Sequence, residues 1–195
     1  MLAIAVFFSL KETESEDRRQ GAARLMSELM SGKAAVGGPF TLADPSGASR
    51  SLAEFRGKIV LLYFGYAGCP DVCPTDLTRI GETLRSLGAN EGSVQALFVT
   101  LDPERDTPPV LREYAAAFHP RLIALRGGEE ETRRIATSYK VFYEKVPQPG
   151  GGYLIDHAAF TFLLDREGRY VAFFPPGTHA DRIAVMVREA LAGTR

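Results

Sequence analysis

The residues of this chain best suited to chemistry are its only two cysteines, Cys69 and Cys73. Two cysteines cannot build a disulfide framework, and a structural zinc site usually takes four protein ligands. The pair is therefore a local device for redox chemistry or metal binding, unless both side chains only fill space as small hydrophobes. The prolines and glycines around them favour the reactive interpretation, because such residues present thiols at a turn.

The neighbouring sequence predicts that the sulfurs lie where a strand gives way to a helix. Residues 58–64 form a near-continuous apolar run, typical of a central strand buried on both faces. Pro70 and Pro74 both favour a first helical position and cannot both lie within one undistorted helix. We therefore expect a turn that holds Cys69 and a regular helix from near Pro74. The positive end of that helix favours thiolate, and a spacing of four lets the sulfurs share a metal or form a disulfide.

A metal bound here needs a third ligand, and histidine is the natural source. Thiolates are soft ligands that select Cu(I) or zinc over hard cations. We expect His119, at the end of a predicted helix, and His179, near a helix start, to be solvated surface residues. His157 follows a glycine-rich loop and precedes a predicted strand. Considered alone, a histidine in that place is more often structural than a ligand.

Three aspartates lie in segments that could approach the cysteines. Asp102 ends a predicted strand and is interpreted as a turn residue, while Asp106 or Thr107 is interpreted as a helix cap. Any of Asp102, Asp106 and Asp156 could orient the His157 ring by accepting a hydrogen bond from the ring nitrogen that does not bind the metal. We favour the purely structural interpretations for all three.

The rest of the pattern predicts an α/β sandwich, because strands alternate with helices before a hairpin and a last helix. Expected strands cover residues 94–101, 122–125, 159–164 and 170–174, and expected helices cover 77–87, 108–118, 129–139 and 183–191. Residues 147–152 are expected to form a loop. The net charge of −1 gives no reason to expect a nucleic-acid partner.

The N-terminal segment is expected to lie outside the folded domain. Gly37, Gly38 and Pro39 break any helix, so we divide the chain into residues 1–35, an apolar segment and tether, and residues 36–195, the domain. The apolar run at 2–10 is too short to cross a bilayer. It fits a frayed or interfacial terminus, or the trailing half of a membrane anchor.

Together the motifs resemble the Sco/SenC family over residues 36–192. Each motif alone is unspecific, but their order and spacing also match. They are Phe64-Gly65-Tyr66 with Cys69-Pro70-Asp71-Val72-Cys73-Pro74, then Val99-Thr100-Leu101-Asp102-Pro103-Glu104-Arg105-Asp106-Thr107-Pro108, then Asp156-His157 with Phe162-Leu163-Leu164-Asp165 and Gly168.

The resemblance implies a thioredoxin-like fold, with a central mixed sheet flanked by helices, and a copper-binding assembly factor rather than an enzyme. It implies that Cys69, Cys73 and His157 bind Cu(I), Cu(II) or both. It further implies that the protein helps to assemble the dinuclear copper centre of cytochrome c oxidase subunit II, by delivering copper or preparing its thiols. The implied location is the periplasmic side of the bacterial inner membrane. Other periplasmic copper chaperones and thiol reductants are possible partners.

Two departures from the family pattern bear on these expectations. Family members usually carry a full N-terminal membrane anchor, whereas this sequence shows at most its last part, so inner-membrane attachment stays open. Ala67 and Gly68, which precede the first cysteine, are smaller than the polar or aromatic pair often found there. The smaller pair alters access to the site but removes no ligand.

Two other functions compete: a thiol:disulfide oxidoreductase or peroxidase, and a sensor in which a Cys69–Cys73 disulfide reports on redox conditions. Thioredoxin-like reductases typically use Cys-x-x-Cys, whereas three residues separate these cysteines. Similar reductases also place a cis-proline before the last hairpin, yet residues 156–165 contain no proline and His157 lies near that place. Copper binding and redox sensing can coexist, since a disulfide cannot ligate copper and its reduction would gate loading.

Overall fold

The computed structural model describes residue 27 and residues 35–193 of the chain. The predicted tether and apolar segment lie almost wholly outside that range, so the division at residue 36 stays a prediction. The described elements belong to one compact unit, Val36–Arg195. Among the described residues, no helix has the length and apolar character needed to cross a membrane.

A five-stranded mixed sheet forms the centre of this unit, in the order β5-β4-β3-β8-β9. The two middle strands, β3 (Ile59–Gly65) and β4 (Val94–Thr100), are buried along their whole length and pair in parallel. Their apolar sequences fit this place, because a parallel strand covered on both faces needs apolar side chains on both. The predicted fold class, thioredoxin-like with a mixed sheet between helices, is confirmed.

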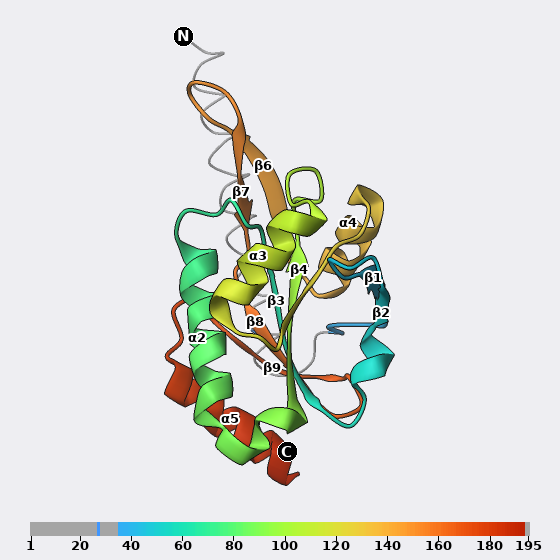
Figure 1. Ribbon diagram of the computed structural model, residues 1–195, viewed down its shortest axis with the longest axis vertical. Helices are drawn as coiled ribbons and strands as arrows, with labels where there is room; N and C mark the ends of the chain where they lie inside the picture. The colour runs from blue at the N-terminus through green and yellow to red at the C-terminus, as the bar shows by residue number, and fades with distance from the viewer. Residues whose placement is uncertain (1–26, 28–34, 194–195) are drawn as a thin grey trace, which may run out of the picture. The chain divides into compact units, whose positions relative to one another are not determined.

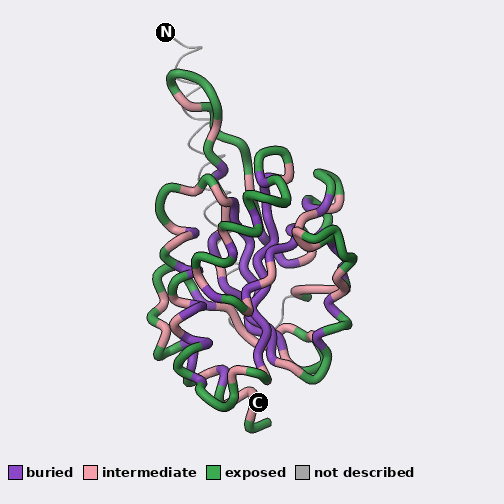
Figure 2. Tube along the Cα trace, viewed as in Figure 1, coloured by how far each residue is buried: buried purple, intermediate pink, exposed green. Residues whose placement is uncertain are grey.

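Helices connect the parallel strands and cover the sheet (Figure 1). α2 packs against α5, while α3 packs against β5. Figure 2 shows the consequence, a buried centre of strands inside an exposed shell of helices and loops. The remaining elements are β1 (Thr41–Ala43), β2 (Ser49–Ser51), α2 (Val72–Ser86), α3 (Pro108–Phe118), β5 (Leu122–Leu125), α4 (Glu129–Ser138), β8 (Thr161–Leu164), β9 (Tyr170–Phe174), α5 (Ala180–Ala192) and two 3₁₀ helices, Leu52–Phe55 and Gly88–Ser93.

A separate hairpin of β6 (Tyr143–Pro147) and β7 (Tyr153–His157) projects from the sheet, at the upper end in Figure 1. The two strands form an antiparallel sheet of their own, in which Tyr143 pairs with His157. The loop predicted at 147–152 joins the two strands, whereas β7 has no counterpart among the predicted strands. This hairpin matters for function because it carries His157 toward the cysteines.

Candidate metal centre

The cysteine loop follows β3 directly and ends in the first turn of α2. Cys69 lies in the loop and is half-buried, whereas Cys73 lies inside the helix and is fully buried. The helix begins at Val72, two residues before the predicted start at Pro74. Pro74 is tolerated there because the first four N–H groups of a helix have no partner within it. The predicted turn around Cys69 is confirmed.

Gly65, the last residue of β3, leaves the space that the second sulfur fills. A Cβ atom at this position would lie 2.8 Å from Cys73 Sγ and 2.9 Å from Cε1 of Tyr63. Both distances are well inside van der Waals contact. The absence of a side chain at Gly65 therefore lets the helix start pack closely against the strand.

His157 completes a cluster of three metal-ligating side chains. Its Nε2 atom lies 3.3 Å from Cys73 Sγ, and the ligand atoms of Cys69, Cys73 and His157 all lie within 4.8 Å of one another. The Cys73 backbone N–H also donates to Cys69 Sγ at 3.4 Å. The structure thus brings together the three residues that the sequence analysis singled out.

The electrostatics of the site make Cys69 the thiolate of the pair. Hydrogen bonding with Cys73 is the main reason why the pKa of Cys69 falls to about 3. Burial opposes that shift, while hydrogen bonds with His157 and with backbone N–H groups support it. The same hydrogen bond with Cys69, together with burial, raises the pKa of Cys73. One charged sulfur and one neutral sulfur therefore share the site when no cation is present.

Apart from its contact with the cysteine sulfurs through Nε2, the imidazole of His157 is surrounded by aromatic rings. The rings of Tyr63 and Tyr66 meet the His157 ring nearly at right angles, with centroids 6.4 and 6.1 Å away. Its Nδ1 atom is buried and has no hydrogen-bond partner among the described residues. In the part of the chain that the structure describes, no carboxylate bonds Nδ1, so none of the three aspartates orients this ring.

The three aspartates take places that the sequence predicted only in part. Asp156 is exposed, in agreement with a structural interpretation. Asp106 is buried and does not cap α3: its carboxylate accepts from the Ala67 backbone N–H and the Thr100 hydroxyl, and Thr107 holds the N-cap position without a side-chain hydrogen bond. Asp102 is fully buried and is more than a turn residue, because its carboxylate accepts from the Tyr153 hydroxyl and pairs with Arg105.

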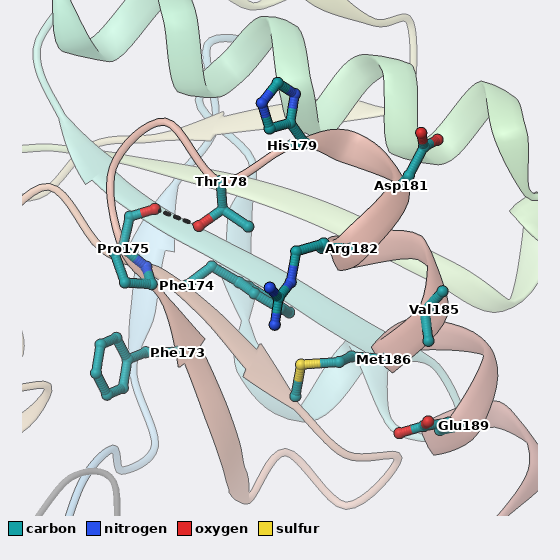
Figure 3. Close-up of a pocket in the computed structure, with 10 residues that line it drawn as sticks. All are labelled: Phe173, Phe174, Pro175, Thr178, His179, Asp181, Arg182, Val185, Met186 and Glu189. Atoms are coloured by element: carbon teal, nitrogen blue, oxygen red, sulfur yellow. Dashed lines mark hydrogen bonds between the residues drawn. The ribbon is translucent and has the colours of Figure 1, made fainter.

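The other histidines lie outside the cluster. The expectation of a solvated His119 is wrong, because this side chain is only 4% exposed and its Nδ1 accepts from the Arg121 backbone N–H. Burial lowers the pKa of His119. His179 is exposed, as expected, at the start of α5. It lines an open pocket of about 720 Å³ between β9 and α5 (Figure 3), and neither cysteine nor His157 lines that pocket.

Fold and site together define a class: a thioredoxin-like domain in which two cysteines and a histidine form a soft-metal or redox centre. The family follows from comparison. The family model described as SCO1/SenC matches residues 28–192, and the chain belongs to this family.

Relatives agree with that assignment. The chain is 42% identical over 144 residues to a SCO2-like protein of Rickettsia prowazekii, covering 73% of this chain and 70% of the relative. It is 40% identical over 167 residues to the mitochondrial SCO2 homologue of Bos taurus, covering 84% of this chain and 63% of the relative. The chain thus spans less than two thirds of the bovine protein.

Among solved structures, Bradyrhizobium japonicum ScoI with copper bound is 41% identical to this chain, with a TM-score of 0.74. The match covers 80% of this chain and 99% of that one. Nearly the whole of the solved domain therefore has its counterpart in the fold described above.

Proposed function

We propose that this protein is a copper-binding assembly factor for cytochrome c oxidase, with Cys69, Cys73 and His157 as its copper ligands. The observation that carries the proposal is the convergence of three ligand atoms within 4.8 Å from two separate parts of the chain. Membership of the SCO1/SenC family and similarity to a copper-bound ScoI support it.

The donor set suits copper better than it suits harder cations. Two thiolates favour Cu(I), while an imidazole also suits Cu(II). A cation at this site would draw the proton from Cys73 and balance the two sulfur charges, because metal ligands bind in their deprotonated form. Copper is cargo in this proposal, taken up by the reduced site and passed on.

Cys69 is the sulfur from which a recipient would take the metal. Its side chain is half-buried in the loop, while Cys73 is enclosed by the helix start and β3. The recipient that the family resemblance implies is the dinuclear copper centre of cytochrome c oxidase subunit II, whose thiols this protein would load or prepare. The implied place is the periplasmic side of the bacterial inner membrane, with other copper chaperones and thiol reductants as further partners.

Thiol–disulfide exchange is the second candidate function, and the charge asymmetry of the cysteines favours it. The Cys69 thiolate would attack a partner disulfide and release one partner thiolate. Cys73 would then lose its proton and attack the mixed disulfide. The partner leaves as a dithiol and the Cys69–Cys73 pair becomes a disulfide. In that oxidised state the protein cannot bind copper, so the same pair would also report on redox conditions.

A strain that lacks this gene tests the proposed function. We expect it to lose the copper centre of its cytochrome oxidase when copper is scarce, and to recover it when the wild-type gene is restored. A gene carrying His157→Ala should restore assembly less well. Normal oxidase activity in a copper-limited deletion strain with no second copy of the gene would contradict the proposal.

A further inference from the structure

The loop between β4 and α3, residues 102–106, contacts both segments that supply the candidate metal ligands. These segments are the cysteine loop and the β6–β7 hairpin that carries His157. On one side, Asp106 accepts a 3.0 Å hydrogen bond from the backbone N–H of Ala67, two residues before Cys69. Asp106 is only 2% exposed, and its own N–H donates to the Asp102 carbonyl at 2.9 Å. One end of the loop is therefore fastened to the cysteine loop.

The other end of the loop is fastened to β7, four residues before His157. The Tyr153 hydroxyl donates to Asp102 Oδ1 at 2.9 Å, and Arg105 Nη1 donates to the Tyr153 carbonyl at 2.7 Å. The Arg105 guanidinium lies 3.7 Å from the centroid of the Tyr153 ring and also pairs with Asp102. Charge-assisted hydrogen bonds and a cation–π contact are among the stronger polar interactions of a folded chain.

Arg105 also contacts the ring of Tyr66, which in turn packs against the imidazole of His157. Its guanidinium lies 5.8 Å from the centroid of the Tyr66 ring, and that ring meets the His157 ring edge-on. Tyr66 is only 2% exposed. Arg105 therefore contacts both the ring beside the ligand and the strand that carries the ligand.

The hairpin depends on these contacts to hold its position relative to the central sheet. β6 and β7 do not join the central sheet, and a two-stranded hairpin alone is marginally stable in water. Ile155 is the one residue of β7 that is buried. The His157 ring has no hydrogen bond at Nδ1 among the described residues, so its orientation depends on where the hairpin backbone lies.

We infer that residues 102–106 act as a brace that sets the distance between the cysteines and His157, with Asp102, Arg105 and Tyr153 as positioning residues for that ligand. The inference rests on the proposed function in one respect only: the ligand being positioned binds copper. Loss of the brace leaves both thiolates in place and lets the hairpin move away. Copper then loses its imidazole ligand and dissociates faster.

The test compares Arg105→Gln with the same substitution at an exposed arginine of α4, Arg134→Gln. Arg134 makes an exposed ion pair with Glu131 at 3.9 Å, and exposed pairs contribute little. In the reduced, copper-free protein, we expect amide hydrogen exchange across residues 143–157 to be about tenfold faster in Arg105→Gln, as fits loss of a charge-assisted hydrogen bond. Exchange in β3 should not change, and the control should resemble the wild type.

Copper-loaded protein gives a second readout. In Arg105→Gln the imidazole nitrogen coupling in the electron paramagnetic resonance spectrum of the Cu(II) form should weaken, and release of Cu(I) to a chelator should be about tenfold faster. If Arg105→Gln does not fold, Tyr153→Phe replaces it, because that change deletes only the hydroxyl that bonds Asp102 and Glu104 and should give a smaller effect in the same direction.

Hairpin exchange equal to that of the wild type in Arg105→Gln, or in Tyr153→Phe if it replaces Arg105→Gln, would overturn the brace. Failure of the wild type to bind copper would instead overturn the proposed function, and the exchange comparison would still decide the brace.

Discussion

Cys73 Sγ and His157 Nε2 lie 3.3 Å apart although 84 positions separate the two residues in the chain. Cys73 comes from the start of α2, and His157 comes from the end of a hairpin outside the central sheet. A contact between two such distant elements requires that both be held firmly.

Replacing Gly65 by alanine should disturb the site more than the fold. The added methyl group would meet Cys73 Sγ at 2.8 Å and Cε1 of Tyr63 at 2.9 Å, so the sulfur and the Tyr63 ring beside His157 must shift. We expect copper affinity to fall about tenfold or more and the free energy of unfolding to fall by about 1–3 kcal/mol, as overpacking does. Copper competition and denaturant unfolding measure the two effects.

Gly92→Ala provides the control for that substitution, because a Cβ at Gly92 has nothing within 4 Å and its backbone is not left-handed. It should leave both quantities unchanged. Wild-type copper affinity in Gly65→Ala would show that the close approach at β3 does not position the sulfur.

Alkylation should distinguish the two thiols. The low pKa of Cys69 and its half-buried position predict fast reaction with iodoacetamide at neutral pH, whereas Cys73 is fully buried and its pKa is raised. Mass spectrometry of the reduced protein after a short exposure should find the label on Cys69. In Cys69→Ser the remaining thiol should react slowly. Equal labelling of both cysteines would contradict the asymmetry.

The turn between β8 and β9 should make stability depend on pH. Asp165 Oδ1 accepts from the backbone N–H groups of Glu167 and Arg169, and Oδ2 pairs with Arg169 Nε at 2.8 Å. Burial raises the pKa of Asp165, but hydrogen bonds with the Arg169 backbone and side chain outweigh it, so the pKa is lowered overall. The carboxylate therefore stabilises the fold above its unfolded pKa, near 3.9, and this contribution is lost as pH falls through the folded value.

Asp165→Ala should consequently cost about 1 kcal/mol at pH 7, and the difference from the wild type should shrink below about pH 4. Denaturant unfolding across that pH range measures it. Glu167→Gln keeps the turn backbone and should change little, because Glu167 is exposed. A cost for Asp165→Ala that stays constant down to pH 3 would refute the assignment.

Much of the fold could be predicted because the central strands have a clear hydrophobic pattern in the sequence. Residues 58–64 and 94–101 are apolar on both faces, which only a buried strand or a buried helix allows, and flanking turn residues favour the strand. The cysteine turn was also predictable, since Pro70 and Pro74 restrict where the helix can begin. These signals are local, so they can be read directly from the sequence.

The hairpin and the brace could not be predicted in the same way. β7 lies outside the central sheet and has one buried residue, Ile155, so it shows no continuous apolar run. The weak alternation of Tyr153, Ile155 and His157 was its only local signal. The contacts of Asp102 and Arg105 with Tyr153 join segments about fifty positions apart. His119 was misjudged because its burial comes from tertiary packing rather than from its own neighbours.

Copper binding by ligand variants tests the central claim most directly. The measurement is copper stoichiometry and affinity of the reduced protein for the wild type, Cys69→Ser, Cys73→Ser and His157→Ala, alongside an insulin-reduction assay. We predict one copper per wild-type chain. Affinity should be largely lost in either serine variant, because a hydroxyl replaces a soft thiolate. His157→Ala should keep weakened Cu(I) binding and lose more of its Cu(II) binding, with little or no insulin reduction in any form. Strong insulin reduction together with copper affinity indifferent to His157 would contradict the account and identify the protein as a thiol:disulfide oxidoreductase.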